Sequence, residues 1–189
     1  MIDARHAGPA RIVDTERRPL RPIGTTASEV ARRTGELLTG LLRLPGVRLY
    51  QGVRLNGQPP LPYALSAGPR VVLVDAVAWP PGSYATSAAG AVFCGGVYIG
   101  QSAGPLLGAV RRLRRLQPRG HRASAVVVVH PSIAGRLDLP AATGSEVSWI
   151  PAGDAVTAIR CLLRSGGTRR TAPRIVEALT AASGGTPIA

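Results

Sequence analysis

The sequence predicts an α/β fold in which a mixed β-sheet is flanked by helices. Segments with apolar residues at helical spacing occur along the chain together with short apolar runs rich in valine. Turn dipeptides such as Pro-Gly, Asn-Gly and Gly-Pro separate these segments. The expected order is helix, three strands, hairpin, helix, strand, strand and helix, which is typical of a sheet packed between helices.

The chain of 189 residues is expected to have three parts. Residues 1–24 contain three prolines and five arginines but no helical pattern of apolar residues, which predicts a flexible arm. Residues 25–165 form the α/β domain. Residues 166–189 begin with Gly166-Gly167 and are expected to be a basic linker followed by a short, loosely attached helix or tail.

The first helix is predicted to begin at Thr26, which forms a capping-box pair with Glu29, and to end near Leu44 at the Pro45-Gly46 turn. Three strands follow, separated by Asn-Gly and Gly-Pro turns, at residues 47–55, 63–67 and 71–79. The third strand is apolar on both faces, and this pattern predicts a central position in the sheet.

A shorter hairpin is expected at residues 91–99. Pro105 then opens a second helix, whose apolar positions are Leu106, Ala109, Val110, Leu113 and Leu116. Further strands are predicted at residues 125–129 and 147–150, and Asp154 caps a helix with Ile159 and Leu163 on its inner face. Residues 173–182 form the last helix.

The charge of the chain points to an anionic partner. All 23 basic side chains are arginines, and only ten residues are acidic, so the net charge is +13. Without lysine, Schiff-base chemistry and a P-loop lysine are excluded. Guanidinium groups bind phosphate in a bidentate manner, which favours nucleic acid, while an anionic membrane surface or an acidic protein is the alternative.

The sequence also bears on location. No apolar run approaches the roughly 18 residues of a membrane span. The start of the chain lacks the pattern of a secretory signal, and two cysteines form no disulfide pattern. These observations predict a cytoplasmic protein.

Several short pieces within residues 33–164 carry a resemblance to a known family. In chain order they are Thr34-Gly35-Glu36, Gly68-Pro69 with the strand up to Trp79, Val97-Tyr98-Ile99, Gly104-Pro105-Leu106, Ala109-Val110 and the segment from Val126 to Pro131. In their order and spacing they resemble the nuclease-related domain family, a branch of the Asp…Glu-x-Lys endonuclease superfamily. The resemblance implies a restriction-endonuclease-like core with the order helix, three strands, helix, strand.

The chain departs from that family at the positions that carry catalysis. Such nucleases bind a divalent ion between carboxylates, and a lysine orients the attacking water. The resemblance places Tyr63 at the Asp position, Asp75 at the Glu position and Val77 at the Lys position. Glu36 is the other acid expected near the site, so Glu36 and Asp75 are vestigial candidates for at most a weak Mg²⁺ site. We therefore expect a non-catalytic domain without a required metal, with a residual metal-dependent nuclease as an alternative.

The sharpest binding feature of the sequence is the set of arginines on and after the second helix. These are Arg111, Arg112, Arg114 and Arg115, followed by Arg119 and Arg122 in the next loop. The spacing predicts two arginine columns beside the apolar stripe, Arg112 with Arg115 and Arg111 with Arg114. We expect these side chains to bind DNA phosphates without sequence specificity, because no base-reading motif is present. A solvated helix face, or a scaffold module that binds an acidic protein, is the alternative.

The two cysteines are alternative nucleophiles. Cys94 lies in an apolar strand, where a structural thiol is favoured, although His121 or His130 could serve as its base. Cys161 is expected in the core beside Leu162. No spacing of Cys and His is typical of a zinc site.

Overall fold

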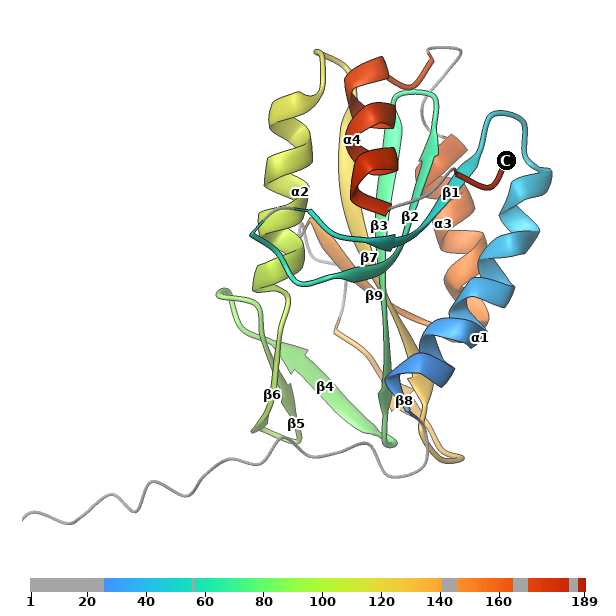
Figure 1. The fold of residues 1–189 in the computed structure, drawn as a ribbon. Coiled ribbons are helices and arrows are strands. Elements are labelled where there is room, and N and C mark those ends of the chain that lie inside the picture. Colours follow the sequence, from blue (N-terminus) through green and yellow to red (C-terminus); the bar gives the residue numbers. More distant parts are fainter. Residues whose placement is uncertain (1–25, 56, 141–145, 165–169, 184–186) are drawn as a thin grey trace, which may run out of the picture.

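The computed structural model of the chain has the predicted mixed α/β fold, with sheets flanked by helices (Figure 1). The structure describes residues 26–55, 57–140, 146–164, 170–183 and 187–189. The predicted arm at residues 1–24 and Gly166-Gly167 lie outside these ranges. Within them, no helix has the length and apolar character needed to cross a bilayer.

A five-stranded sheet with the order β1-β2-β3-β7-β9 forms the centre of the fold. Its strands are β1 (Arg48–Val53), β2 (Leu61–Ala67), β3 (Arg70–Trp79), β7 (Arg122–Pro131) and β9 (Val147–Pro151). The first three are antiparallel neighbours, whereas β7 is parallel to both β3 and β9. The central position predicted for residues 71–79 is confirmed, because β3 pairs with β7 along its whole length.

Two pairs of helices cover the two faces of this sheet (Figure 1). The helices are α1 (Ala27–Thr39), extended by the 3₁₀ turn η1 (Gly40–Arg43), α2 (Gly104–Leu116), α3 (Ala155–Arg164), preceded by the 3₁₀ turn η2 (Ala152–Asp154), and α4 (Pro173–Ser183). Side chains alternate between the faces of a strand. On β3, Val72 and Val74 therefore pack beneath α1 and α3, and Leu73 packs beneath α2 and α4.

The start of α1 follows the sequence prediction. The Thr26 hydroxyl accepts a hydrogen bond from the backbone N–H of Glu29 at 3.2 Å, which satisfies one of the donors left open at a helix start. The predicted single helix to Leu44 is instead an α-helix that tightens into a 3₁₀ turn after Thr39.

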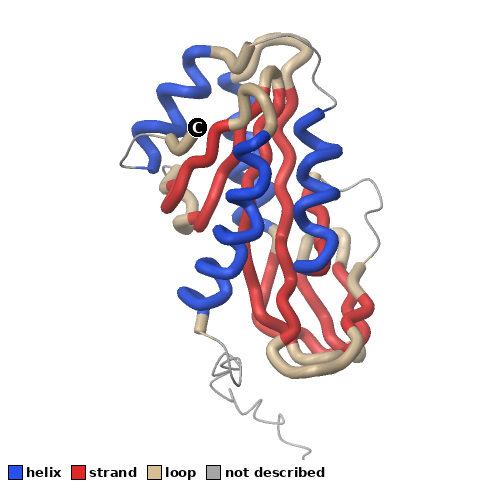
Figure 2. Tube along the Cα trace, turned by 90° about the vertical axis from the view of Figure 1, so that its right-hand side faces the viewer, coloured by secondary structure: helices blue, strands red, loops and turns tan. Residues whose placement is uncertain are grey.

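A second, smaller sheet is built from three strands between β3 and β7 in the chain and one short strand after β7. Its order is β6-β5-β4-β8, with β4 (Gly82–Thr86), β5 (Ala91–Cys94), β6 (Val97–Ser102) and β8 (Leu137–Asp138). Figures 1 and 2 place it at one end of the molecule. The β5–β6 hairpin was predicted, whereas β4 and β8 were not. In β4 only Tyr84 is large and apolar, so no alternating pattern marks the strand.

The last helix is firmly packed, so the prediction of a loosely attached helix is wrong. Ile175 and Leu179 of α4 are fully buried, and both belong to the apolar cluster beneath α2. The backbone N–H of Arg54 donates to the carbonyl of Ala182 at 2.8 Å. Four residues separate Ile175 from Leu179, and this spacing places both on one face of a helix.

The burial of α4 leads to a stability prediction. Leu179→Ala removes a fully buried side chain and leaves a cavity, so we expect the free energy of unfolding to fall by about 2–5 kcal/mol in urea denaturation. Glu177→Ala, on the exposed side of the same helix, is the control and should change it by less than about 0.5 kcal/mol. A Leu179→Ala protein as stable as the control would mean that α4 does not hold the fold together.

Candidate functional site

The central sheet separates the two carboxylates that were expected to bind a metal ion. Asp75 lies on β3 between Leu73 and Val77, which both pack in the cluster beneath α2 and α4. Because side chains alternate along a strand, Asp75 points to that face. Glu36 lies on α1, which covers the opposite face, and there it is exposed and paired with Arg32. The structure does not bring Glu36 and Asp75 together.

The described residues also contain no group of three His, Cys, Asp or Glu side chains that could hold a metal ion. A divalent metal therefore does not fit the carboxylates that the resemblance suggested, and no hydrolytic step can be derived through them.

Tyr63, at the position of the family's first acid, anchors α1 to the sheet. Its hydroxyl donates a hydrogen bond to the carbonyl of Ala31 at 3.0 Å. The ring approaches Gly35 so closely that a Cβ at this position would collide with the phenol oxygen. Burial raises the pKa of Tyr63, and the nearby charge of Glu36 raises it further. In this chain Gly35 and Tyr63 therefore have a packing role that is sufficient to explain both residues.

Asp75 is a half-buried carboxylate with a backbone partner. Its Oδ1 accepts a hydrogen bond from the N–H of Ala76 at 2.8 Å. The pattern of the strand also allowed Asp75 to pair with an arginine, but no arginine of the described residues forms an ion pair with it. Burial raises the pKa of Asp75, and the hydrogen bond from Ala76 opposes this only in part.

We expect Asp75→Asn to stabilise the protein at neutral pH. Because the pKa of Asp75 is raised in the folded state, the ionised carboxylate destabilises the folded protein. The side-chain oxygen of an asparagine can still accept the hydrogen bond from the N–H of Ala76. The gain in the free energy of unfolding should be largest at pH values above the folded-state pKa of Asp75. It should disappear as the pH falls toward the pKa of the unfolded state, near 3.8. Urea denaturation at neutral and acidic pH measures this. Stabilisation of the parent protein, but not of the variant, by Mg²⁺ would instead identify Asp75 as a metal ligand.

A buried polar pair joins α1 to β7 on the other face of the sheet. The hydroxyl of Thr34 and Nε2 of His130 lie 2.8 Å apart, and both side chains are buried. Thr34 stands between Val30 and Leu38 on the inner side of α1. Burial lowers the pKa of His130, and the positive charge of Arg33 lowers it further.

The pair was missed from the sequence, although a signal was present. Thr34 lies four residues from both Val30 and Leu38, so it occupies a core position of the helix. A buried polar side chain needs a hydrogen-bond partner. The partner, His130, is distant in sequence and could not be assigned without the fold.

His130 should make the stability of the fold sensitive to acid. Because its folded pKa lies below 6.5, the unfolded state binds the proton more tightly, and stability falls as the pH drops below about 6.5. His130→Gln removes this titration, so the parent protein should lose stability relative to the variant between pH of about 7.5 and about 5. Urea denaturation across this range tests the prediction, with His121→Gln as the control that keeps the effect. An equal pH dependence of parent and His130→Gln proteins would contradict it.

The structure does not assemble a thiol–imidazole pair around Cys94. Cys94 is half-buried beside Tyr84, and burial together with this thiol raises the pKa of Tyr84. His130 is bonded to Thr34 on the α1 side of the sheet. His121 precedes β7, at the opposite end of the strands from β4 and its neighbour Cys94.

Cys161 is exposed, so its predicted place in the core is wrong. The buried residues of α3 are Ala155, Ile159 and Leu163, which recur every four residues. Cys161 lies two residues from Ile159 and from Leu163, and this spacing turns it to the outer side of the helix.

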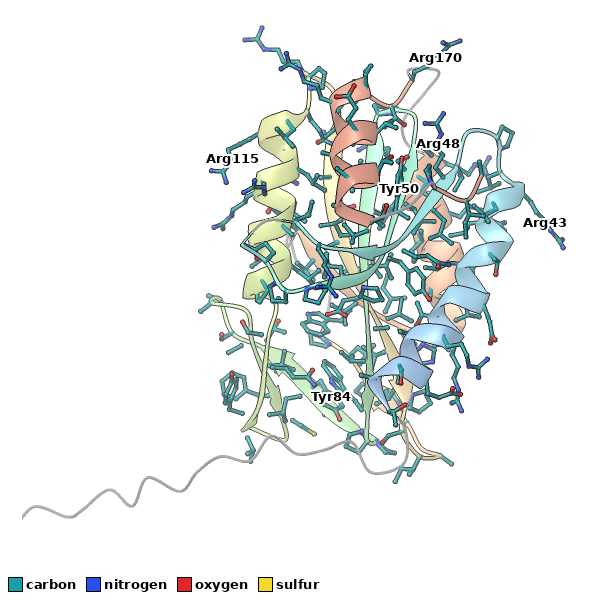
Figure 3. All side chains as sticks on the ribbon, viewed as in Figure 1. Arg43, Arg48, Tyr50, Tyr84, Arg115 and Arg170 are labelled. Carbon is teal, nitrogen blue, oxygen red and sulfur yellow. The ribbon has the colours of Figure 1, made fainter. Side chains whose placement is uncertain are left out.

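The arginines of α2 form one stripe on the outer side of the helix. The inner side is made by Leu106, Ala109, Val110 and Leu113. Arg111, Arg112 and Arg115 are exposed, and Arg115 points away from the body of the molecule (Figure 3). Within the described ranges no carboxylate pairs with these three side chains.

Arg114 has an internal role and does not belong to this stripe. Its Nε and Nη2 donate hydrogen bonds to the carbonyl of Ala123 at 3.2 and 3.1 Å. Its Nη1 donates to Glu146, which precedes β9. Arg114 therefore ties the end of α2 to the sheet, and its guanidinium group, unlike that of Arg111, is bonded within the protein.

Further arginines gather where β3 and β7 begin. Arg119 is exposed in the loop after α2, whereas Arg122 is the first residue of β7, opposite Arg70 of β3, and not a loop residue as predicted. Arg170, which Figure 3 shows at this end, and Arg174 of α4 are exposed as well. Nε2 of His121 lies 3.4 Å from the carbonyl of Arg170.

Arg170 and Arg174 were not among the expected site residues, and neither was Arg70. The sequence does contain a signal for Arg70, because one arginine stands directly before each of two apolar runs. If the two strands are parallel, these arginines must lie at the same edge of the sheet.

Comparisons of the chain with protein-family models, curated proteins and solved structures found no match. The functional interpretation therefore depends on the residues of this chain. The resemblance to the nuclease-related domain family stays a prediction.

Proposed function

We propose that this domain binds the phosphate backbone of nucleic acid without sequence specificity and without cleaving it. The observation that carries the proposal is that some of the described arginines form ion pairs with acidic residues and others do not. Arg32 and Arg33 pair with Glu29, and Arg136 pairs with Asp138. The exposed arginines of the outer stripe of α2 have no such partner among the residues that the structure describes, so their charge is available to an external anion.

The spacing of the stripe suits a polyphosphate. Arg111 and Arg115 are separated by about 6 Å along the helix axis. Duplex DNA presents one negative charge per about 1.7 Å of its axis, so several phosphates lie within reach of the stripe. Arg119 and Arg122 continue the positive surface beyond the end of α2. Guanidinium groups donate two parallel hydrogen bonds to phosphate, which adds to the charge attraction.

The aromatic residues favour contacts to the backbone over stacking on bases. Single-strand binders present aromatic rings along a basic groove. Here Trp79 stacks on Tyr84 and contacts Trp149 inside the protein. Among the described aromatic residues only Tyr98 is substantially exposed, and it lies on β6, away from the arginine stripe. Duplex nucleic acid is therefore the favoured ligand.

The test is a binding assay with two triple variants of equal charge. In one, Arg111, Arg112 and Arg115 become Gln; in the other, the paired Arg32, Arg33 and Arg136 become Gln. Arg114 is kept because it holds the fold. Each lost phosphate contact lowers the slope of log affinity against log salt by about 0.9, so three lost contacts lower it by about 2.7. We expect this loss, with weaker binding to duplex DNA, only for the first variant.

Equal loss of affinity in both triple variants would show that net charge alone is sensed. If the parent protein ignores duplex DNA but binds an acidic polypeptide such as polyglutamate through the same three arginines, the scaffold hypothesis replaces the proposal. Urea denaturation of each variant verifies that the fold is intact.

A further inference from the structure

One long segment of this basic chain carries no charge. From Ala76 to Val110 the sequence contains no Arg, Lys, His, Asp or Glu, although the chain as a whole has a charge of +13. The segment comprises the end of β3, the strands β4, β5 and β6, and the first half of α2. The strands β4, β5 and β6, which Figures 1 and 2 place at one end of the molecule, are therefore uncharged and are called the neutral end here. The neighbouring strand β8 carries Asp138, which pairs with Arg136.

The neutral end presents apolar side chains to solvent on the β5–β6 hairpin. Val97 is 69% exposed and Tyr98 is 40% exposed. The ring of Tyr98 packs against Phe93 of β5, with 5.8 Å between the ring centres. Gly95 and Gly96 have φ angles of 55° and 85°, which a tight two-residue hairpin turn requires. The hairpin is thus a preformed apolar projection.

The strand β6 is the open edge of the small sheet. It stands first in the order β6-β5-β4-β8, and no strand of the described chain pairs with its outer side. Native proteins protect such edges with charged side chains, prolines or bulges. The pairing of β5 with β6 has a register shift between Ala91 and Phe93, whereas Val97 and Tyr98 beside the turn pair regularly. Since β6 contains neither charge nor proline, neither of these blocks a further strand along Val97–Ile99.

We infer that this hairpin is a self-association surface, at which a second copy of the chain pairs edge to edge along Val97–Ile99. Two molecules of charge +13 repel each other wherever their arginines meet, and the neutral end is where they can approach. Antiparallel pairing of the same strand produces a closed twofold dimer, in which Val97 and Tyr98 of each copy meet apolar side chains of the other.

The distribution of charge favours a second copy as the partner. Arg111, the first charge after the segment, lies about 10 Å along the helix from the start of α2. An acidic partner would instead bind the arginine stripe of α2. An anionic bilayer is not favoured either, because the hairpin contains no arginine to bind its headgroups.

Sedimentation equilibrium of the full chain tests the inference. The protein is measured from about 1 to 100 µM in high salt, because a dimer population depends on concentration. We expect a dimer for the parent protein. Val97→Glu and Val97→Arg should raise the dissociation constant of the dimer about tenfold or more, because each change places a charged side chain against the apolar residues of the paired strand. Ile133→Glu and Ile133→Arg are matched controls, since Ile133 is 57% exposed in the turn between β7 and β8 and does not belong to the β5–β6 hairpin. These controls should remain dimeric.

A parent protein that is monomeric over the whole range would overturn the inference. Val97 variants that dimerise as well as the parent, with unchanged urea denaturation curves, would overturn it too. Binding to vesicles of neutral phosphatidylcholine tests the alternative that the hairpin contacts a lipid bilayer. Binding of a monomeric parent protein to these vesicles, lost in Val97→Glu, would assign the hairpin to a bilayer. None of these outcomes depends on nucleic-acid binding, which uses other residues.

Discussion

Two parallel strands that are apolar on both faces form the centre of this protein, and their need for cover on both sides organises the chain. On β3 and β7, consecutive valines and leucines point alternately to the two faces of the sheet. A sheet of this kind is stable only when helices shield each face from water. The pairs α1 with α3 and α2 with α4 meet that requirement. The same requirement explains why α4, the last helix, is integral to the domain.

The sheet that the helices protect also decides which side chains can act together. Glu36 and Tyr63 lie on the α1 side, and Asp75 and Val77 lie on the α2 side. Positions that would carry a nuclease site in the family that the sequence resembles are therefore used here for packing or divided by the sheet. The proposed binding function is based instead on the exposed arginines on the outside of α2.

Features that depend on neighbours in sequence could be predicted. The cap at Thr26, the helix opened by Pro105 and the central strand at residues 71–79 are each fixed by local pattern, and the structure has all three. Features that depend on distant neighbours could not. The partner of Arg114 is Glu146, and the partner of Thr34 is His130.

The face to which a candidate residue points was equally inaccessible from sequence. Periodicity places Asp75 on the opposite side of β3 from Val74, but it does not tell which helix covers that side. The arginines show the same limit. Their number and spacing on the second helix could be predicted from the sequence. That Arg114 bonds within the protein, while its neighbours form an outer stripe, could be seen only once β7 and Glu146 were placed.

The pairing of β3 with β7 has a consequence for how the chain acquires its structure. The register joins Arg70 to Arg122 and Trp79 to Pro131, so residues 80–121 form a closed loop between the two central strands. The antiparallel β1–β2–β3 ribbon and the β5–β6 hairpin involve only short loops, and such contacts form quickly. Closing the long loop is entropically unfavourable until the valines of both strands are buried together. We therefore expect a slow final folding step, during which the exposed central strands make the nascent chain prone to aggregation.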